Sequence, residues 1–271
     1  MSLPNMVTPR SKPVSLLFAG IVGVTLLVGL VATFRNDLHP QSDPLLVHCA
    51  DSLRTVMTGI AASYERETSN RVELSFGGSQ TLLANLAIRQ RGDLFLAAED
   101  RHIALAGEKN LIANTIALAE QTAVIAVPKG NPKGVHSLAD LRNLTLTLSQ
   151  TSPDAAAIGK LFRNATLTNG FWQSLSNQTK VFQPTATDAA NDVKLGAVDA
   201  AIVWDSMQKQ YPDLEFIRAP ELESVKARVV IGILRCSAQP EAAERFARYV
   251  ATPRQGQIFQ SNGFRLLPAS R

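Results

Sequence analysis

The chain has 271 residues, of which 45% are hydrophobic and 18% charged, enough to bury a large core as one two-lobed unit or two small domains. Lysine and arginine exceed aspartate and glutamate by four. No stripe of basic residues with interleaved aromatic residues is present, which argues against nucleic acid as a partner.

The first element along the chain is an uncharged apolar run at residues 14–34. Its length is typical of a helix that spans a bilayer. Arg10 and Lys12 precede it, and the positive-inside rule then places residues 1–13 in the cytoplasm. The remainder of the chain is therefore expected outside the membrane, anchored by this transmembrane helix.

A cleavable signal peptide is the alternative interpretation of the same run. Its apolar region is normally shorter and ends in a small-x-small site, whereas Leu30-Val31-Ala32 has leucine where a small residue is required. We therefore expect an uncleaved signal anchor. A polar linker with two prolines follows at residues 35–44.

From residue 45 onward, apolar strands alternate with amphipathic helices, which predicts an α/β fold of mainly parallel sheets flanked by helices. The expected strands are 46–50, 72–76, 93–97, 122–127, 144–148, 181–182, 200–204, 216–219 and 229–234. The expected helices are 52–68, 80–89, 101–109, 137–141, one beginning near Ser152, one after Pro184, 241–249 and 254–259.

The segment PKGNPKG, residues 128–134, is rich in glycine and proline and predicts a hinge between two lobes. Lobe 1 is then expected to comprise residues 45–127 and 230–271, and lobe 2 residues 128–229. No GK[ST] follows the segment, so it does not match a phosphate-binding P-loop.

Residues 45–100 repeat one arrangement twice: an apolar strand, a turn carrying a serine, and a helix. Ser52 follows the first strand and Ser79 the second. The free N–H groups and the positive dipole end of a helix N-terminus favour an anion at such a point. The alternative is that both serines serve only as helix N-caps.

No catalytic constellation is evident in the sequence. The four histidines are His39, His48, His102 and His136, and none has the spacing of a metal site or a serine-nucleophile site. His48 and Cys49 are adjacent on a strand and point to opposite faces. No HExxH, CxxC or GxSxG motif occurs. We therefore expect no enzyme activity, no cofactor and no bare metal ion.

Cys49 and Cys236 are the only two cysteines. Outside the cytoplasm they can form a disulfide. As residues on buried strands they can equally be inert core thiols. The sequence leaves both possibilities open.

A series of short motifs resembles one known family. In chain order they are CADSL, SFGGSQTLL, GDLFLAAED, VPKGNP, SLADL, SPDAAAIGK, VKLGAVDAAIVW and PRQGQIFQSNGF. The order resembles that of the molybdate-binding proteins of ABC importers, which have the type II periplasmic binding protein fold. The resemblance covers about residues 45–265.

The resemblance implies a set of ligand-binding positions. The two family serines match Ser52 and Ser79, and a helix-start alanine matches Ala156. A second amide donor falls at residues 186–188, for which Thr187 is the central candidate. The family tyrosine falls on Trp204, whose indole can donate one hydrogen bond but accept none. Trp204 is equally compatible with a place in the core.

Two carboxylates depart from the family pattern. Asp51 replaces a residue that is usually small, and Asp154 lies near the turn of the second lobe. Either side chain would repel a dianion if it faced the ligand. A related group of tungstate- and molybdate-binding proteins coordinates the metal through carboxylates, so Asp154 is an alternative ligand. Asp188 and Asp205 are expected to be solvated or to cap helices.

Together with the anchor expected at residues 14–34, the resemblance implies an extracytoplasmic, monomeric protein that captures molybdate or tungstate between its lobes. It would deliver the oxyanion to the permease and ATPase subunits of an ABC importer, without a cofactor. The alternative function is a membrane-anchored sensor or accessory domain for another anion or small acid, such as sulfate.

Overall fold

The computed structural model describes residues 43–143, 145–168 and 170–267. The expected cytoplasmic tail, the membrane anchor and nearly all of the linker lie outside the described residues. Among the helices that are described, none is both long and apolar enough to cross a membrane. The chain from Asp43 onward forms one compact unit.

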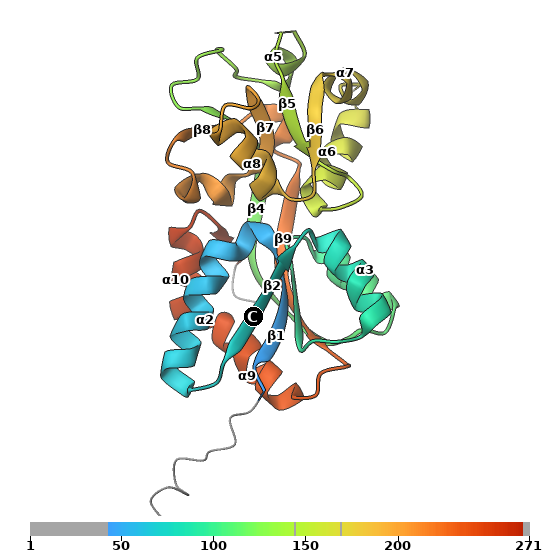
Figure 1. Cartoon of the computed structure of the whole chain (residues 1–271), viewed down its shortest axis with the longest axis vertical. Coiled ribbons are helices and arrows are strands. Elements are labelled where there is room, and N and C mark those ends of the chain that lie inside the picture. Colours follow the sequence, from blue (N-terminus) through green and yellow to red (C-terminus); the bar gives the residue numbers. More distant parts are fainter. Residues whose placement is uncertain (1–42, 144, 169, 268–271) are drawn as a thin grey trace, which may run out of the picture. The chain divides into compact units, whose positions relative to one another are not determined.

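This unit is α/β, as expected, with two lobes joined by shared strands (Figure 1). The strands are β1 (Leu45–Ala50), β2 (Val72–Gly77), β3 (Leu94–Ala97), β4 (Ile112–Pro128), β5 (Leu148–Thr151), β6 (Thr179–Gln183), β7 (Ala200–Trp204), β8 (Leu214–Ile217), β9 (Lys226–Leu234) and β10 (Arg265–Leu266). The helices are α2 (Arg54–Thr68), α3 (Ser79–Arg89), α4 (Asp100–Glu108), α5 (Leu138–Asn143), α6 (Ala157–Thr168), α7 (Trp172–Gln178), α8 (Ala186–Lys194), α9 (Pro240–Val250) and α10 (Pro253–Ser261), with short 3₁₀ helices η1 (Asp51–Leu53), η2 (Asp205–Gln210) and η3 (Pro220–Leu222).

The strand order runs β2-β1-β3-β9-β4 in the first lobe and continues β4-β7-β5-β6 in the second. The pairs β1–β2, β1–β3, β5–β6 and β5–β7 are parallel. All described pairs that involve β4 or β9 are antiparallel. The expectation of mainly parallel sheets is therefore wrong: each lobe has parallel outer strands and antiparallel crossing strands.

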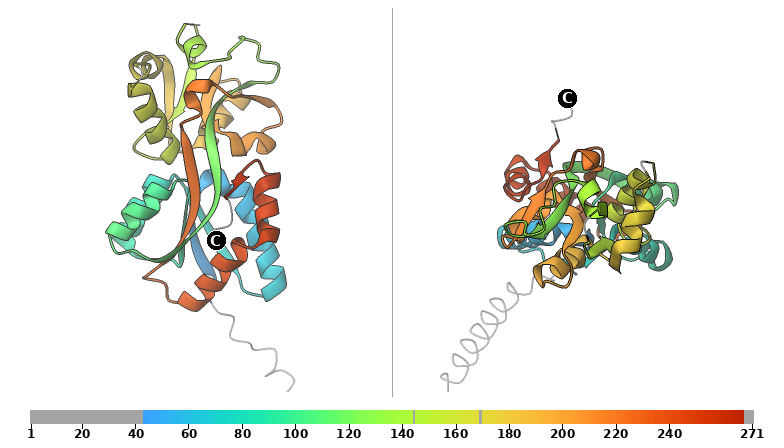
Figure 2. Two further views of the ribbon diagram at one scale, coloured as in Figure 1. Left: turned by 180° about the vertical axis from the view of Figure 1, so that it is seen from behind. Right: turned by 90° about the horizontal axis from the view of Figure 1, so that it is seen from above.

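Strand β4 passes from one sheet into the other. Its residues from Ile112 to Thr122 pair with β9, and from Ala123 onward it lies between β7 and β8. Figure 2 shows β4 and β9 running together from one lobe to the other. The pairing changes sheet between residues 122 and 123, so the expected boundary at residue 127 and the expected hinge at 128–134 lie beyond the crossing. The first half of β4 is largely exposed, which explains why its apolar pattern did not predict a strand.

A buried polar side chain holds the crossing point. Gln121 is fully buried; its Nε2 donates to the carbonyl of Ala98 at 3.1 Å, and its Oε1 accepts from Ser206 Oγ at 2.8 Å. Ala98 follows β3 in the first lobe, whereas Ser206 lies in η2 directly after β7 of the second. Gln121 therefore links elements of both lobes at the strand they share.

Asp205 reinforces the same junction. Its Oδ1 accepts from the backbone N–H of Thr122 at 2.8 Å, and its Oδ2 lies 3.2 Å from Arg218 Nη2. The carboxylate is buried rather than solvated, contrary to one of the two expectations for it. Because a buried carboxylate requires partners, the amide and the guanidinium explain its position here.

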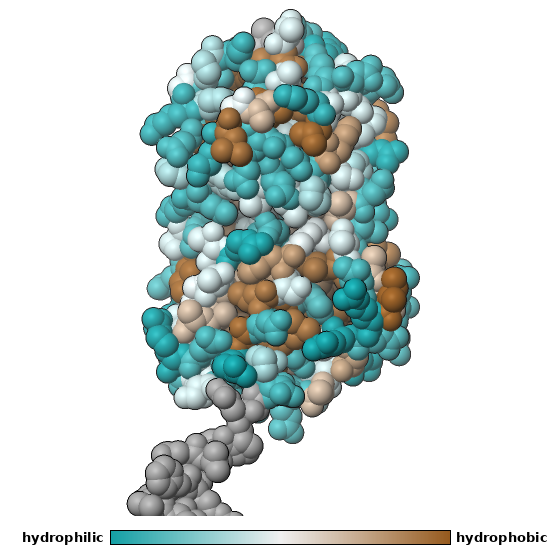
Figure 3. Space-filling model, viewed as in Figure 1, coloured by the Kyte–Doolittle hydropathy of each residue, from teal (hydrophilic) through white to brown (hydrophobic). Residues whose placement is uncertain are grey.

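One apolar core cluster contains side chains from both lobes, because β4 and β9 run through both. On the face shown in Figure 3, apolar side chains gather over β2, between α2 and α3. Val72, Leu74 and Phe76 of β2 are partly buried there.

Cys49 is buried in the core and Cys236 is half-buried; both are free thiols, so the structure shows no disulfide between them. Burial raises the pKa of each thiol.

Two elements of the second lobe differ from the sequence prediction. Strand β5 begins at Leu148, where the expected strand ends, and helix α7 was not predicted. The residues of β5 after Leu148 are polar but buried. Ser149 Oγ donates to Asp192 at 2.7 Å, and Gln150 Nε2 donates to Thr179 Oγ1 at 2.6 Å. A buried strand made mostly of polar residues carries no apolar signal, which explains the error.

The Gln121 junction predicts a stability defect. Gln121→Leu should lower the free energy of unfolding by about 1–3 kcal/mol, because the Ala98 carbonyl and the Ser206 hydroxyl lose a buried partner. Urea denaturation measures the change. Gln208→Leu, at an exposed position of η2, is the control. Equal stability of the two variants would contradict the role given to Gln121.

Candidate functional site

A small cavity lies between the lobes, close to the crossing strands. Its volume is about 20 Å³, and both lobes contribute to its lining. The lining residues are Ala50, Asp51, Ser52, Gly77, Gly78, Ser79, Ala98, Ala156, Ala157, Ile158, Thr185, Ala186 and Trp204. Four of the five residues predicted from the sequence, Ser52, Ser79, Ala156 and Trp204, are brought together here.

Four helix starts converge on this cavity. In the first lobe, η1 leads into α2 directly after β1, and α3 begins after β2. In the second lobe, the starts of α6 and α8 supply lining residues. The first N–H groups of a helix have no acceptor within that helix and carry the positive end of its dipole. The cavity is thus surrounded by hydrogen-bond donors from both sides.

The two serines of the first lobe are not helix caps. The N-cap of α3 is Gly78, and the N-cap of α2 is Leu53; neither helix has a side-chain cap bond. Ser52 Oγ is buried and has no hydrogen-bond partner in the described part of the chain. Ser79 Oγ accepts from the Ala98 N–H at 3.2 Å, which leaves its own proton free to donate. The N-cap interpretation is therefore wrong for both.

The start of α6 differs in detail from the expectation. The helix begins at Ala157, and the N–H of Ala156 donates to the Ser152 carbonyl at 3.2 Å. The amide of Ala156 is therefore occupied, although the residue lines the cavity. Asp154 is exposed and is not one of the lining residues, so the structure does not place its carboxylate at the cavity.

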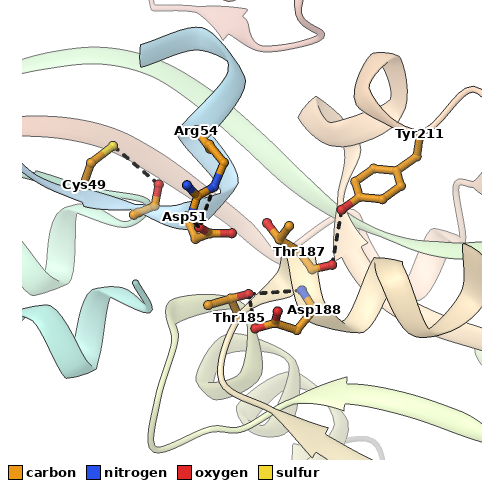
Figure 4. Close-up of polar contacts among 8 residues, drawn as sticks. Cys49, Asp51, Arg54, Thr185, Thr187, Asp188 and Tyr211 are labelled. Atoms are coloured by element: carbon orange, nitrogen blue, oxygen red, sulfur yellow. Dashed lines mark hydrogen bonds and ion pairs between the residues drawn. The ribbon is translucent and has the colours of Figure 1, made fainter. Parts of the chain in front are cut away.

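The side chain of Thr185 caps the start of helix α8. Thr185 Oγ1 accepts from the Asp188 N–H at 3.1 Å and donates to the Asp188 carboxylate at 2.6 Å (Figure 4). Asp188 is thus a capping residue, one of its two expected roles. Thr187 does not line the cavity; its neighbours Thr185 and Ala186 do. The Thr187 hydroxyl is buried without a partner among the described residues.

Tyr211 supports this helix start and was missed from the sequence. Its hydroxyl lies 3.2 Å from the Thr187 carbonyl oxygen (Figure 4). The same hydroxyl lies 3.1 Å from Asn191 Oδ1. Burial, together with the negative charges of Asp51 and Asp188, raises the pKa of Tyr211 to about 12. Tyr211 follows the irregular η2, where no periodic pattern exists to indicate that it packs near the site.

Trp204 and Asp51 bring an indole ring and a carboxylate to the wall of the cavity. Trp204 ends β7 and is 1% exposed, so it is at once a core residue and a wall of the cavity. Asp51 is the lining residue with a charged side chain, and Arg54 Nε donates to its Oδ1 at 3.0 Å. Asp51 therefore reaches the cavity as a paired carboxylate.

A larger cavity of about 260 Å³ lies elsewhere in the first lobe, between β1, β2 and α3. Glu73, Arg89 and Arg91 bring both signs of charge to its wall. The residues of α3 that line it come from beyond the first turn, so its wall lacks the converging helix starts of the small cavity. In the described ranges, no cluster of three or more histidine, cysteine, aspartate or glutamate residues is arranged to hold a metal ion.

The lobes touch directly at Gly78. A Cβ at this position would overlap the Ala155 carbonyl oxygen and lie 2.9 Å from the Pro184 carbonyl oxygen. The Thr81 N–H donates to the same Ala155 oxygen at 3.3 Å. Gly78 has a φ of −67°, which any residue can adopt, so glycine is required here by space rather than by backbone conformation.

Residues 45–265 match the model of the bacterial extracellular solute-binding protein family. The chain belongs to this family. It is 27% identical over 260 residues to the molybdate-binding protein ModA of Mycobacterium tuberculosis, covering 92% of this chain and 97% of the relative. The family consists of binding proteins rather than enzymes.

Solved structures share the two-lobed periplasmic binding fold. The periplasmic molybdate-binding protein of Azotobacter vinelandii aligns with a TM-score of 0.72 at 16% identity, covering 83% of this chain and 99% of that chain. The sulfate-binding protein SubI of Mycobacterium tuberculosis aligns with a TM-score of 0.74 at 16% identity, covering 83% and 88%. At these identities the likeness concerns the fold.

The close approach at Gly78 predicts the effect of one added methyl group. Gly78→Ala should destabilise the contact between the lobes by about 1–3 kcal/mol, because the methyl group overlaps backbone oxygen atoms. Small-angle scattering should then report a larger radius of gyration. Gly77→Ala is the matched control, since its Cβ meets only the flexible side chain of Leu82. An unchanged radius in Gly78→Ala would refute the steric requirement.

The raised pKa of Tyr211 predicts a pH dependence. In the folded protein Tyr211 keeps its proton up to about pH 12, whereas in the unfolded chain it loses the proton near its usual pKa of 10. Tyr211 therefore stabilises the folded state below pH 10, and this contribution to the free energy of unfolding is lost as the pH rises toward 12. Urea denaturation between these values should show a steeper decline for the natural chain than for Tyr211→Phe. Identical declines would show that Tyr211 titrates normally.

Proposed function

We propose that the chain is an extracytoplasmic binding protein that captures molybdate or tungstate in the inter-lobe cavity and delivers it to an ABC importer. The observation that carries the proposal is the convergence of four helix starts and two available serine hydroxyls on one buried cavity. Its lining includes no lysine or arginine. The site therefore offers hydrogen-bond donors without a positively charged side chain in its lining.

Such a donor set favours a fully deprotonated tetrahedral oxyanion. Each oxygen of the ion can accept hydrogen bonds, and charge-assisted hydrogen bonds are stronger than neutral ones. An oxygen that carries a proton needs an acceptor, so a site made of donors discriminates against it. Selection between ions of equal charge then rests on size.

We assign the donors as follows. In the first lobe, the hydroxyls of Ser52 and Ser79 would each donate one hydrogen bond. In the second lobe, the first-turn amides of α6 and α8 would complete the shell, beginning at Ala157 and Ala186. Ala156 and Trp204 would form walls of the cavity. Thr187, which does not line the cavity, would support the start of α8 without touching the ion.

Lobe closure would accompany capture. Separation and closure about the crossing strands is the hinge motion by which binding proteins of this type enclose a ligand. The closed form would then dock on the permease, with the ATPase subunit driving transport. We retain as proposals the anchor at residues 14–34, the monomeric state and a location on the outer side of the cytoplasmic membrane.

Sulfate is the second candidate, and one observation favours it. The sulfate-binding protein SubI shares the fold over most of both chains. Sulfate is also a tetrahedral dianion, so the same donors would serve it. The chain would then act in sulfate uptake, or as a membrane-anchored sensor.

Isothermal titration calorimetry of the purified chain tests the ligand. Molybdate and tungstate should bind more tightly than sulfate and phosphate. Ser52→Ala and Ser79→Ala should each weaken molybdate binding by about 1–3 kcal/mol, because each removes a donor from a buried oxygen. Ser224→Ala, at an exposed position, is the control. Equal weak binding of all four ions, or none, would exclude molybdate, and tighter sulfate binding would favour the second candidate.

A further inference from the structure

A carboxylate at an anion site requires an explanation. Asp51 belongs to η1, is 7% exposed and lines the cavity next to Ser52. Figure 4 shows its side chain on the side of the cleft that faces the start of α8, where Thr185, Thr187 and Asp188 lie. An unpaired negative charge there would oppose a dianion. Binding of a dianion at this site therefore requires that the negative charge of Asp51 be balanced.

Arg54 supplies the opposing charge. Its Nε donates to Asp51 Oδ1 at 3.0 Å, and its Nη2 donates to the same oxygen. The guanidinium is held in place from its other side, since its central carbon lies 4.0 Å from the centre of the Phe76 ring. Phe76 is the last residue but one of β2, which ends at Gly77 and leads to Gly78 and Ser79. The Arg54 side chain, which is 48% exposed, thus bridges Asp51 of η1 and Phe76 of β2.

The pairing is asymmetric. Both donors of Arg54 go to Oδ1, and Oδ2 receives no hydrogen bond from the described residues. The other carboxylate near this side of the cleft, Asp188, accepts a hydrogen bond from the Thr185 hydroxyl, and the Asp188 N–H donates to the same hydroxyl oxygen. Arg54 therefore balances the negative charge of Asp51 and not that of Asp188.

We propose that Arg54 is a positioning residue that sets the charge selectivity of the cleft, by neutralising Asp51 so that a doubly charged oxyanion can bind. With the pair intact, the lining together with Arg54 behind it has no net charge, and the donors of the lining favour a dianion. Without Arg54, Asp51 opposes a dianion about twice as strongly as a monoanion, since Coulomb energy scales with the product of the charges. The inference rests on the proposed oxyanion function.

Two tetrahedral ions test this by calorimetry: molybdate, a dianion, and perrhenate, a monoanion of similar shape. Arg54→Met should weaken molybdate binding at least tenfold, and more than it weakens perrhenate binding. Asp51→Asn combined with Arg54→Met should restore molybdate binding to within threefold of the natural chain. Arg248→Met, which breaks the exposed pair with Glu244 on α9, is the matched control and should change neither affinity.

Each alternative result overturns the proposal. Unchanged molybdate affinity in Arg54→Met removes the charge role. An equal loss for both ions, or a folded double variant that does not recover, indicates a structural role instead. If Arg54→Met does not fold, Asp51→Asn alone decides, because it should retain or tighten molybdate binding, and a loss refutes the inference. If the natural chain binds neither ion, the proposed function fails as well.

Discussion

The pairing of β4 with β9 is the constraint on which the rest of the structure depends. These two antiparallel strands run through both lobes, and every other described strand joins a sheet through them, directly or through a neighbour. Because β4 changes partners between Thr122 and Ala123, both lobes share one continuous backbone. The buried contacts of Gln121 and Asp205 then fix the junction beside the cavity.

The site follows from that arrangement. Parallel outer strands in each lobe end toward the junction, so the helices that follow them begin there. Four helix starts meet where neither lobe alone would enclose a ligand. Their amides and two serine hydroxyls supply donors, and the Asp51–Arg54 pair adds no net charge. Under the proposed function, selectivity for a dianion comes from geometry and neutrality rather than from cations.

Much of this could be predicted from sequence, and the failures have physical reasons. The repeated strand–serine–helix pattern predicted the two turns that hold Ser52 and Ser79, because apolar periodicity is strong in β1, β2 and their helices. The passage of β4 from one lobe to the other was not predicted, because the first half of β4 is largely exposed and its sequence lacks the apolar pattern of a strand. Tyr211 and the polar strand β5 act through contacts between distant segments, which local patterns do not encode. Arg54 lies only three residues after Asp51, but its stacking on Phe76 joins two segments that are far apart in the sequence.

The central claim is that the inter-lobe cavity holds molybdate through neutral donors. A crystal structure of the chain with molybdate, recorded at the molybdenum absorption edge, tests it most directly. We expect one anomalous peak between the lobes, with oxygens within hydrogen-bond distance of Ser52 Oγ, Ser79 Oγ and the first amides of α6 and α8. A peak at another site, or none under saturating molybdate, would contradict it.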